Sequence, residues 1–455
     1  MRRKIAPTAE MLDRVAGVRG RLLDLAARKA HEHHLPLVRA VVAGSAARGT
    51  FLSDRVDIDL FLLFPPELPR ADLESHGLKL AGLLFETAET RYAEHPYLRG
   101  TYEGFQVDAV PGYAIRDPSH PQTAVDRTPF HHEYLRTHQT PELIEETRLA
   151  KQFLRAQGIY GSEAKTQGLS GYAVELLILK YGSLDELLAA ARTFTPPVRI
   201  VFTPGASPRV PAEVPLLLDD PVDPHRNVTS ALSRRNFTLL LLAAQAYLAA
   251  PDPRFFRPRP AARLGRERAL ERIRARRTHV VALTLPRPRL VDDIVYPQLA
   301  KGARAIAEEA RRAGFTVVGS AFAASEATVT ILLEADPAAL SEVRSQDGPP
   351  PGPDRVAQFL AKWTDPSAPV LQGPFVAEDG RLAVETRRGE PGLEAALNRH
   401  LDRISLGRDL TRSLRAEDRF VPLDRAHEVP ELELALGELL VKQLPWLVPD
   451  GAASS

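Results

Sequence analysis

Two aspartates lie two positions apart in an otherwise apolar stretch, Asp57-Ile58-Asp59-Leu60-Phe61. In a β-strand, the period of two residues places both carboxylates on the same face. Adjacent like charges repel unless cations bind between them, and hard divalent ions with oxygen ligands meet that need. Asp108 lies in a second apolar stretch and supplies a third carboxylate. Asp57, Asp59 and Asp108 therefore predict a site for two Mg²⁺ ions.

A possible phosphate site precedes the aspartates. Gly44 and Ser45 follow a predicted strand and open a short helical turn, where backbone and hydroxyl groups can bind an anion. Arg48 adds positive charge one turn later. Surface aspartates on an edge strand would equally explain an isolated D-x-D motif. The combination of strand, Gly-Ser, D-x-D and a later lone aspartate predicts nucleotidyl transfer.

These residues need a scaffold, and the sequence pattern predicts an α+β one. A helix over 7–33, strands over 37–43, from Asp57, around 89–92 and over 102–111, and a helix over 73–86 form a small mixed sheet with helices. Further helices are expected over 141–156, 169–181, 184–192 and 233–250. After a Pro-rich break, strands at 279–285, 315–318 and 328–334, a helix at 292–313, a helix at 356–363, a hairpin at 372–376 and 382–386, and a helix around 432–444 complete the expected elements.

Composition excludes several classes of protein. The 455-residue chain is too long for one compact core. It contains no cysteine, which rules out disulfides, thiol catalysis and Cys-ligated zinc. No apolar run reaches the length of a membrane span, and the N-terminus lacks the apolar core of a secretory signal. We therefore expect a cytoplasmic protein with no membrane contact.

The net charge of +1 argues against a basic surface over the whole chain, but arginines are dense between Arg254 and Arg277. Arginine suits bidentate phosphate contacts, so this stretch is a candidate for binding nucleic acid. A solvated helix face is the alternative interpretation.

The chain resembles the nucleotidyltransferase superfamily and, in more detail, archaeal-type (class I) CCA-adding enzymes. The resemblance covers nearly the whole chain. It rests on the segments 44–50, 57–61, 107–113, 126–132, 158–161, 168–172, 175–177, 220–228, 289–298 and 372–374.

The resemblance implies a tRNA nucleotidyltransferase that builds or repairs the 3′-terminal CCA from CTP and ATP without a template, releasing pyrophosphate. It implies a polymerase-beta-like catalytic head (1–140), a helical nucleotide-reading neck (141–255) and an α/β, RRM-like C-terminal body and tail (256–455). The tRNA acceptor stem and 3′ end would be the partner, and a second copy of the chain is a further candidate.

The resemblance also assigns residues. Asp57, Asp59 and Asp108 match the family's metal ligands. The remaining matches concern the nucleotide: Ser45, Arg48 and His131 for triphosphate and ribose, Arg155 for a triphosphate-binding lysine, and Arg226 for reading the incoming base. Ala164 departs from the family, which usually has tyrosine there; one triphosphate contact is thereby lost, and Lys165 or water could replace it.

Other interpretations of these residues stay open. His131 could cap or pack instead of facing phosphate, Arg226 could form a salt bridge at a helix start, and Tyr160 and Tyr172 fit a core role better than base stacking. Two rival functions also remain. One is a poly(A)-type or small-molecule nucleotidyltransferase, and the other is an RNA-binding protein with a decayed catalytic head.

Overall fold

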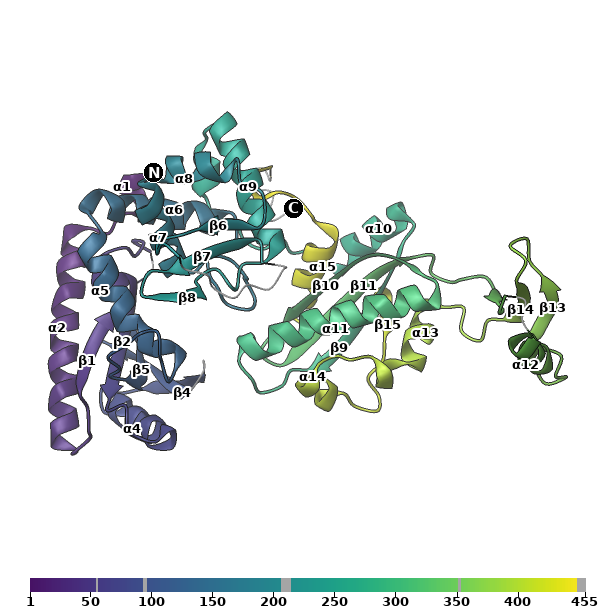
Figure 1. Ribbon diagram of the computed structural model, residues 1–455, viewed down its shortest axis with the longest axis horizontal. Coiled ribbons are helices and arrows are strands. Elements are labelled where there is room, and N and C mark those ends of the chain that lie inside the picture. Colours follow the sequence, from purple (N-terminus) through teal and green to yellow (C-terminus); the bar gives the residue numbers. More distant parts are fainter. Residues whose placement is uncertain (55, 93–95, 206–213, 351–352, 448–455) are drawn as a thin grey trace. The chain divides into compact units, whose positions relative to one another are not determined.

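The computed structural model describes residues 1–54, 56–92, 96–205, 214–350 and 353–447. The chain forms two compact units (Figure 1). The first comprises Met1–Arg259 with two short later segments, and the second comprises most of the chain from Pro260 onward. No helix in the described ranges is both long enough and apolar enough to cross a membrane.

The first unit begins with a five-stranded mixed sheet in the order β1-β2-β5-β4-β3. Strands β2 and β5 are parallel, and the other neighbours are antiparallel. The strands are β1 (Arg39–Ala43), β2 (Asp57–Phe64), β3 (Ala88–Tyr92), β4 (Pro96–Tyr102) and β5 (Phe105–Tyr113). The predicted strand over 102–111 is wrong at its start, because Glu103 and Gly104 have positive φ and turn the chain from β4 into β5.

Alternation along β2 and β5 separates a polar face from an apolar one. Ile58, Leu60, Val107 and Ala109 are fully buried in a core shared with helix α2 (Ala9–Glu32) and helix α4 (Arg70–Gly82). The intervening aspartates point to the other face. Two short helices, α1 (Arg2–Ile5) and α3 (Gly44–Arg48), complete this part.

Helices dominate the rest of the first unit, as predicted. Four of them begin at a Ser or Thr whose hydroxyl accepts a hydrogen bond from the first turn, which satisfies a backbone donor that the helix leaves unpaired. The helices are α5 (Thr128–His138), α6 (Pro141–Ala156), α7 (Gly171–Tyr181), α8 (Leu184–Ala191) and α9 (Arg234–Ala249). Helix α5 was not predicted.

A small sheet that the sequence did not predict lies among these helices. It has the order β6-β7-β8, with β6 (Val198–Ile200), β7 (Leu216–Asp220) and β8 (Asp223–Asn227). Strand β7 is buried along its whole length, whereas β8 is polar and contains a proline. This sheet brings Asp220 and Arg226 into the neighbourhood of α5.

The second unit contains a four-stranded antiparallel sheet in the order β10-β11-β9-β15. Its strands are β9 (His279–Pro286), β10 (Thr316–Ala324), β11 (Thr328–Asp336) and β15 (Val421–Pro422). Helix α11 (Asp292–Ala313) joins β9 to β10, which gives the β-α-β-β start of a ferredoxin-like or RRM-like arrangement. The expected α+β multidomain fold is therefore confirmed.

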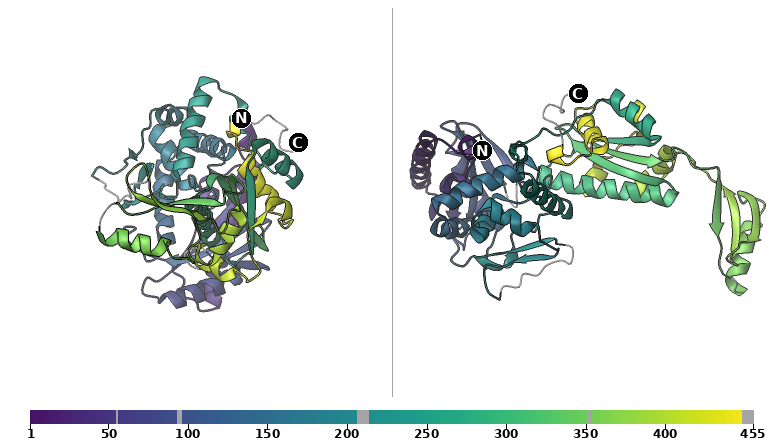
Figure 2. Two further views of the ribbon diagram at one scale, coloured as in Figure 1. Left: turned by 90° about the vertical axis from the view of Figure 1, so that its right-hand side faces the viewer. Right: turned by 90° about the horizontal axis from the view of Figure 1, so that it is seen from above.

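Helices cover both faces of this sheet (Figures 1 and 2). Val281 and Leu283 of β9 belong to one buried cluster, and Val280 and Ala282 to another. The first cluster includes α11, α13 (Leu393–Arg399) and α14 (Arg408–Ser413). The second includes α10 (Arg266–Arg276) and α15 (Leu432–Leu440).

A separate three-stranded antiparallel sheet is inserted between β11 and α13. Its order is β12-β14-β13, with β12 (Val343–Asp347), β13 (Val370–Val376) and β14 (Leu382–Arg387). Helix α12 (Pro353–Trp363) accompanies it, and the hairpin predicted around Asp379-Gly380 connects β13 to β14.

Candidate active site

The three predicted carboxylates lie on one face of the first sheet, on two neighbouring strands. Asp57 and Asp59 lie on β2, and Asp108 lies on the parallel neighbour β5 directly opposite Asp59. The apolar residues that alternate with them hold the backbone of both strands in the core. The strand register alone therefore places Asp59 beside Asp108.

Gly44 lies against the Asp59 side chain. Ala43 of β1 pairs with Asp59, and Gly44 then turns away with φ of 71°, in the left-handed region that favours glycine. A Cβ atom at this position would lie 2.0 Å from Asp59 Oδ2. Glycine is therefore required here both by the backbone conformation and by the close carboxylate.

The electrostatics of Asp59 reflect this crowding. Burial, followed by the charges of Asp108 and Asp57, raises the pKa of Asp59 to about 7. Across the strand pair, Arg99 of β4 donates two hydrogen bonds to Asp108, each 2.6 Å long. The bond to this carboxylate raises the pKa of the Arg99 guanidinium further.

Oxygen ligands of this kind suit Mg²⁺, which prefers carboxylates together with substrate phosphates. Like charges on two neighbouring strands also favour a cation. Nevertheless, among the described residues no three His, Cys, Asp or Glu side chains gather closely enough to hold a metal ion. The oxygen donors suit the ion in type, and in this conformation Arg99 engages both oxygens of Asp108.

A cavity of about 310 Å³ adjoins Asp59, and its volume is within the range of small-ligand sites. Four predicted residues line it: Ser45, Arg48, Asp59 and His131. The other lining residues are Gly44, Thr128, Lys151, Tyr160, Gly171, Tyr172 and Glu175. The cavity thus has an acidic edge at Asp59 and cationic side chains elsewhere in its wall.

A buried charge network fixes Arg48. Its Nε and Nη2 atoms lie 2.8 and 2.7 Å from Glu175 Oε2. Oε1 of the same carboxylate accepts hydrogen bonds from Thr50 Oγ1 (2.6 Å) and Lys151 Nζ (2.8 Å). Burial alone would raise the pKa of Glu175, but Arg48 and Lys151 outweigh it and hold that pKa at about 2. Two cations face one carboxylate, so net positive charge remains for an anionic ligand.

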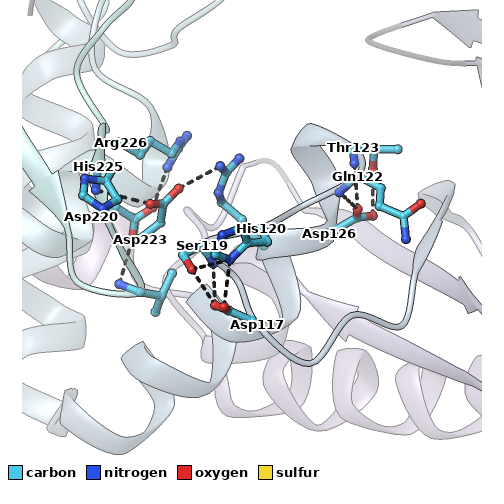
Figure 3. Close-up of polar contacts among 12 residues, drawn as sticks. Asp117, Ser119, His120, Gln122, Thr123, Asp126, Asp220, Asp223, His225 and Arg226 are labelled. Atoms are coloured by element: carbon cyan, nitrogen blue, oxygen red, sulfur yellow. Dashed lines mark hydrogen bonds and ion pairs between the residues drawn. The ribbon is translucent and has the colours of Figure 1, made fainter. Parts of the chain in front are cut away.

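A second network surrounds Asp220, at the end of β7. Its Oδ2 accepts hydrogen bonds from His131 Nε2 and Arg226 Nη1, both 2.8 Å long, and its Oδ1 accepts one of 2.9 Å from Tyr172 Oη. Figure 3 shows Arg226 directed at the Asp220 carboxylate. Burial would raise the pKa of Asp220, but His131 and Arg226 hold it at about 2.

His131 also stacks on Tyr172, with ring centroids 4.1 Å apart. Burial lowers the pKa of His131, the neighbouring Asp220 partly opposes this, and Nε2 lies 2.8 Å from Asp220 Oδ2. Its neighbour His132 instead lies 3.4 Å from Arg48 Nη1, and burial followed by that charge lowers the pKa of His132 to about 4. The adjacent histidines thus serve different networks and do not form a metal pair.

The buried Asp126 carboxylate anchors the segment that leads into α5 (Figure 3). It accepts hydrogen bonds from the backbone N–H groups of Tyr113, Gln122 and Thr123, and from the Thr123 hydroxyl. The end of β5 is thereby tied to the start of α5. This connection positions Thr128 and His131 at the cavity.

Not every predicted residue reaches the cavity wall. Arg155 is paired with Asp54, at 2.9 and 2.7 Å from its two carboxylate oxygens. Ala164 lies in the turn between α6 and α7, and Arg226 reaches the site through Asp220. Arg226 does form a salt bridge, with Asp220, but it does so from strand β8 and not at a helix start.

The sequence did not single out Arg99, Lys151 or Thr50, and it gave Glu175 and Asp220 no role. Most of them act through a contact with a residue distant in the chain, such as Glu175 with Arg48, whereas Arg99 contacts Asp108 on the neighbouring strand. A signal was present for Lys151 and Glu175, since both occur within helices that are otherwise mostly buried. A buried charge needs a partner of opposite sign, so a buried lysine and a buried glutamate in neighbouring helices predict an ion pair.

The mixed sheet, with its carboxylates and the Gly44-Ser45 turn beside them, defines a nucleotidyltransferase fold. Sequence comparison agrees: residues 26–131 match the family model of the nucleotidyltransferase domain. Residues 145–257 match the tRNA nucleotidyltransferase second domain, and residues 276–421 match the CCA-adding enzyme C-terminal domain.

Full-length relatives identify the family. The chain is 36% identical over 409 residues to a CCA-adding enzyme of Halobacterium salinarum, covering 90% of this chain and 89% of that one. It is 38% identical over 425 residues to a CCA-adding enzyme of Methanoregula boonei, covering 89% and 88%. For one of Archaeoglobus fulgidus the identity is 37% over 383 residues, covering 83% and 85%. The chain belongs to the CCA-adding enzyme family.

Solved structures with similar folds match just over half of the chain. The structure of E. coli MS115-1 CdnC with ATP has a TM-score of 0.43 and 17% identity, covering 56% of this chain and 92% of that one. A cytoplasmic RNA terminal U-transferase has a TM-score of 0.42 and 16% identity, covering 57% and 96%.

Proposed function

We propose that this protein adds and repairs the 3′-terminal CCA of tRNA, using CTP and ATP and releasing pyrophosphate. The main support is that matches to three nucleotidyltransferase family domains follow one another along the chain, while all three expected carboxylates lie on one face of the head sheet. A decayed catalytic head would not be expected to keep that set.

Asp57, Asp59 and Asp108 would hold two Mg²⁺ ions. When bound, such ions lower the pKa of the attacking 3′-hydroxyl and stabilise the leaving pyrophosphate. Strands β2 and β5 position the carboxylates, because their parallel register fixes Asp59 opposite Asp108. Attack on the α-phosphate would then occur at the acidic edge of the cavity.

The triphosphate would lie along Ser45, Arg48 and Lys151. Glu175 holds Arg48 in place before the nucleotide arrives, so the cation need not reorganise during the reaction. Lys151 shares the same carboxylate and prevents it from cancelling the charge of Arg48. Arg155 forms an ion pair with the exposed Asp54. To contact the triphosphate as proposed, Arg155 would have to leave Asp54.

The nucleoside would lie near His131 and Arg226. Asp220 restrains both side chains, and the second ring nitrogen of His131 is not used in that contact. Arg226 retains donors beyond the one given to Asp220, which suits reading of the acceptor groups of a base.

The tRNA would be held largely through phosphates. Arg268, Arg274 and Arg277 are exposed on or beside helix α10, whereas Arg272 and Arg276 donate to Leu440 and Glu334 within the second unit. An A-form acceptor stem is recognised through phosphates and 2′-hydroxyls. A cytoplasmic location and a homodimer remain predictions.

The test is incubation of the full-length protein with a tRNA that ends at the discriminator base. CTP alone should add two residues, ATP alone should add none, and both together should complete CCA and stop. Asp59→Ala should abolish addition, whereas Asp24→Ala, an exposed carboxylate on α2, should not.

Three results would contradict the proposal. Unlimited addition of A would identify a poly(A)-type enzyme. Binding of tRNA without any addition would identify an RNA-binding protein. Near-normal activity of Asp59→Ala would exclude the carboxylate assignment.

A further inference from the structure

Arg99 occupies both oxygens of a carboxylate that the proposed reaction needs. It lies on β4, paired in register with Asp108 on β5. Its Nε and Nη2 atoms each donate a 2.6 Å hydrogen bond, one to each oxygen of Asp108. The two side chains are 26% and 14% exposed, so solvent screens the pair only in part.

This contact conflicts with metal binding in the same conformation. Asp59 and Asp108 are held opposite each other by the backbone, yet with the Arg99 contact in place no three acidic side chains in the described ranges gather around one point. In this conformation the Arg99 guanidinium occupies both Asp108 oxygens, which are the atoms that a metal ion would bind. Turning Asp108 toward Asp57 and Asp59 requires at least one of its bonds to Arg99 to break.

We propose that Arg99 is a resident counter-ion that holds Asp108 in the metal-free protein and is displaced when a divalent ion binds. Arg99 is a positioning residue that acts through Asp108. This inference rests on the proposed two-metal function. Two hydrogen bonds to a charged acceptor make the pair strong enough to compete, and the strand register keeps the guanidinium close after displacement.

A supporting role gives the opposite expectation. If Arg99 instead oriented Asp108 within the metal site, as outer-shell partners of metal ligands do, its removal would weaken metal binding. If Arg99 competes with the metal ion, its removal should strengthen metal binding. The apparent affinity decreases as more of the protein is held in the state in which Arg99 occupies Asp108.

The direct measurement is Mn²⁺ binding to the full-length protein, followed by the electron paramagnetic resonance signal of free Mn²⁺. We expect Arg99→Met to tighten binding by about tenfold, the change for one lost competing charge-assisted hydrogen bond. Arg99→Lys keeps the charge but loses the planar fork, so its affinity should lie between those of wild type and Arg99→Met.

Arg91→Met is the matched control. Arg91 lies on β3, next to β4, and pairs with the exposed Glu89, so its loss should leave Mn²⁺ affinity within about twofold of wild type. Thermal unfolding gives a second measurement. Without metal, Arg99→Met should melt below wild type because Asp108 loses its partner, and added Mg²⁺ should raise its melting temperature more than that of wild type.

Unchanged or weaker Mn²⁺ binding by Arg99→Met would overturn the inference. If the wild type still binds Mn²⁺ and adds CCA, the proposed function survives that result. A wild type that adds CCA without binding Mn²⁺ or Mg²⁺ at these carboxylates would overturn the inference and the metal assignment together. Equal tightening in Arg91→Met would also overturn it, since a general charge effect would then suffice.

Discussion

Gly44→Ala should reduce the catalytic rate far more than it reduces stability, without removing any catalytic carboxylate. The new methyl group would begin 2.0 Å from Asp59 Oδ2, whereas Cβ contacts below 3.0 Å essentially do not occur. The carboxylate or the turn must therefore shift by about 1 Å, and a misplacement of that size can cost about 100-fold in rate. An alanine in the left-handed region adds roughly 1–2 kcal/mol of strain.

Gly158 provides the matched control. It has the same φ of 71°, but a Cβ atom there would meet nothing within 4 Å. Both variants should lose roughly 1–2 kcal/mol in the free energy of unfolding, measured by urea denaturation. Only Gly44→Ala should also lose about 100-fold in kcat/KM for CMP addition. If the two variants had kcat/KM values within about threefold of each other, the close approach of Gly44 to Asp59 would have no catalytic importance.

Three further predictions concern stability. Glu175→Ala should lower the free energy of unfolding by about 3–5 kcal/mol, because Arg48 and Lys151 are left buried without their carboxylate; a loss below about 1 kcal/mol in urea denaturation would contradict this. Asp126→Ala removes the acceptor of four hydrogen bonds and should cost about 3 kcal/mol by the same assay, with no change in slope against urea; an unaffected midpoint would refute the anchoring role. The pKa of His132 is lowered from 6.5 to about 4 in the folded protein, so its contribution to stability is complete above pH 6.5 and is lost as the pH falls toward 4. His132→Asn should remove about 2 kcal/mol of the stability difference between pH 7 and pH 5, and an identical pH dependence in the two proteins would contradict the assignment.

Local pattern was enough to predict elements with strong periodicity. The helices over 141–156 and 292–313 have the predicted bounds, and alternation in β2 correctly placed Asp57 and Asp59 on one face. Strand β4, helix α5 and the sheet β6-β7-β8 were missed. Strand β6 has only three residues, and β8 is polar, so neither carries an apolar period that a sequence reading could detect.

The site residues also fall into two groups, those that a local sequence motif predicted and those that it did not. Ser45, Arg48 and Asp59 belong to one short stretch of sequence, and the structure brings them to one cavity together with His131. The partners that set their charge come from elsewhere: Glu175 reaches Arg48 across 127 positions of sequence. Such pairings depend on how helices pack, and no spacing rule within one sequence encodes them.

The double covering of the four-stranded sheet in the second unit has a consequence for RNA recognition. An RRM sheet binds RNA by stacking bases on exposed aromatic side chains of one open face. Here α10 and α15 occupy that face with buried aliphatic side chains, while Arg268 and Arg274 of α10 are exposed. We expect a unit built this way to bind RNA through phosphate charge and helical shape and not by stacking bases on its sheet. It would suit an enzyme that must accept every tRNA in the cell, whatever the sequence of its acceptor stem.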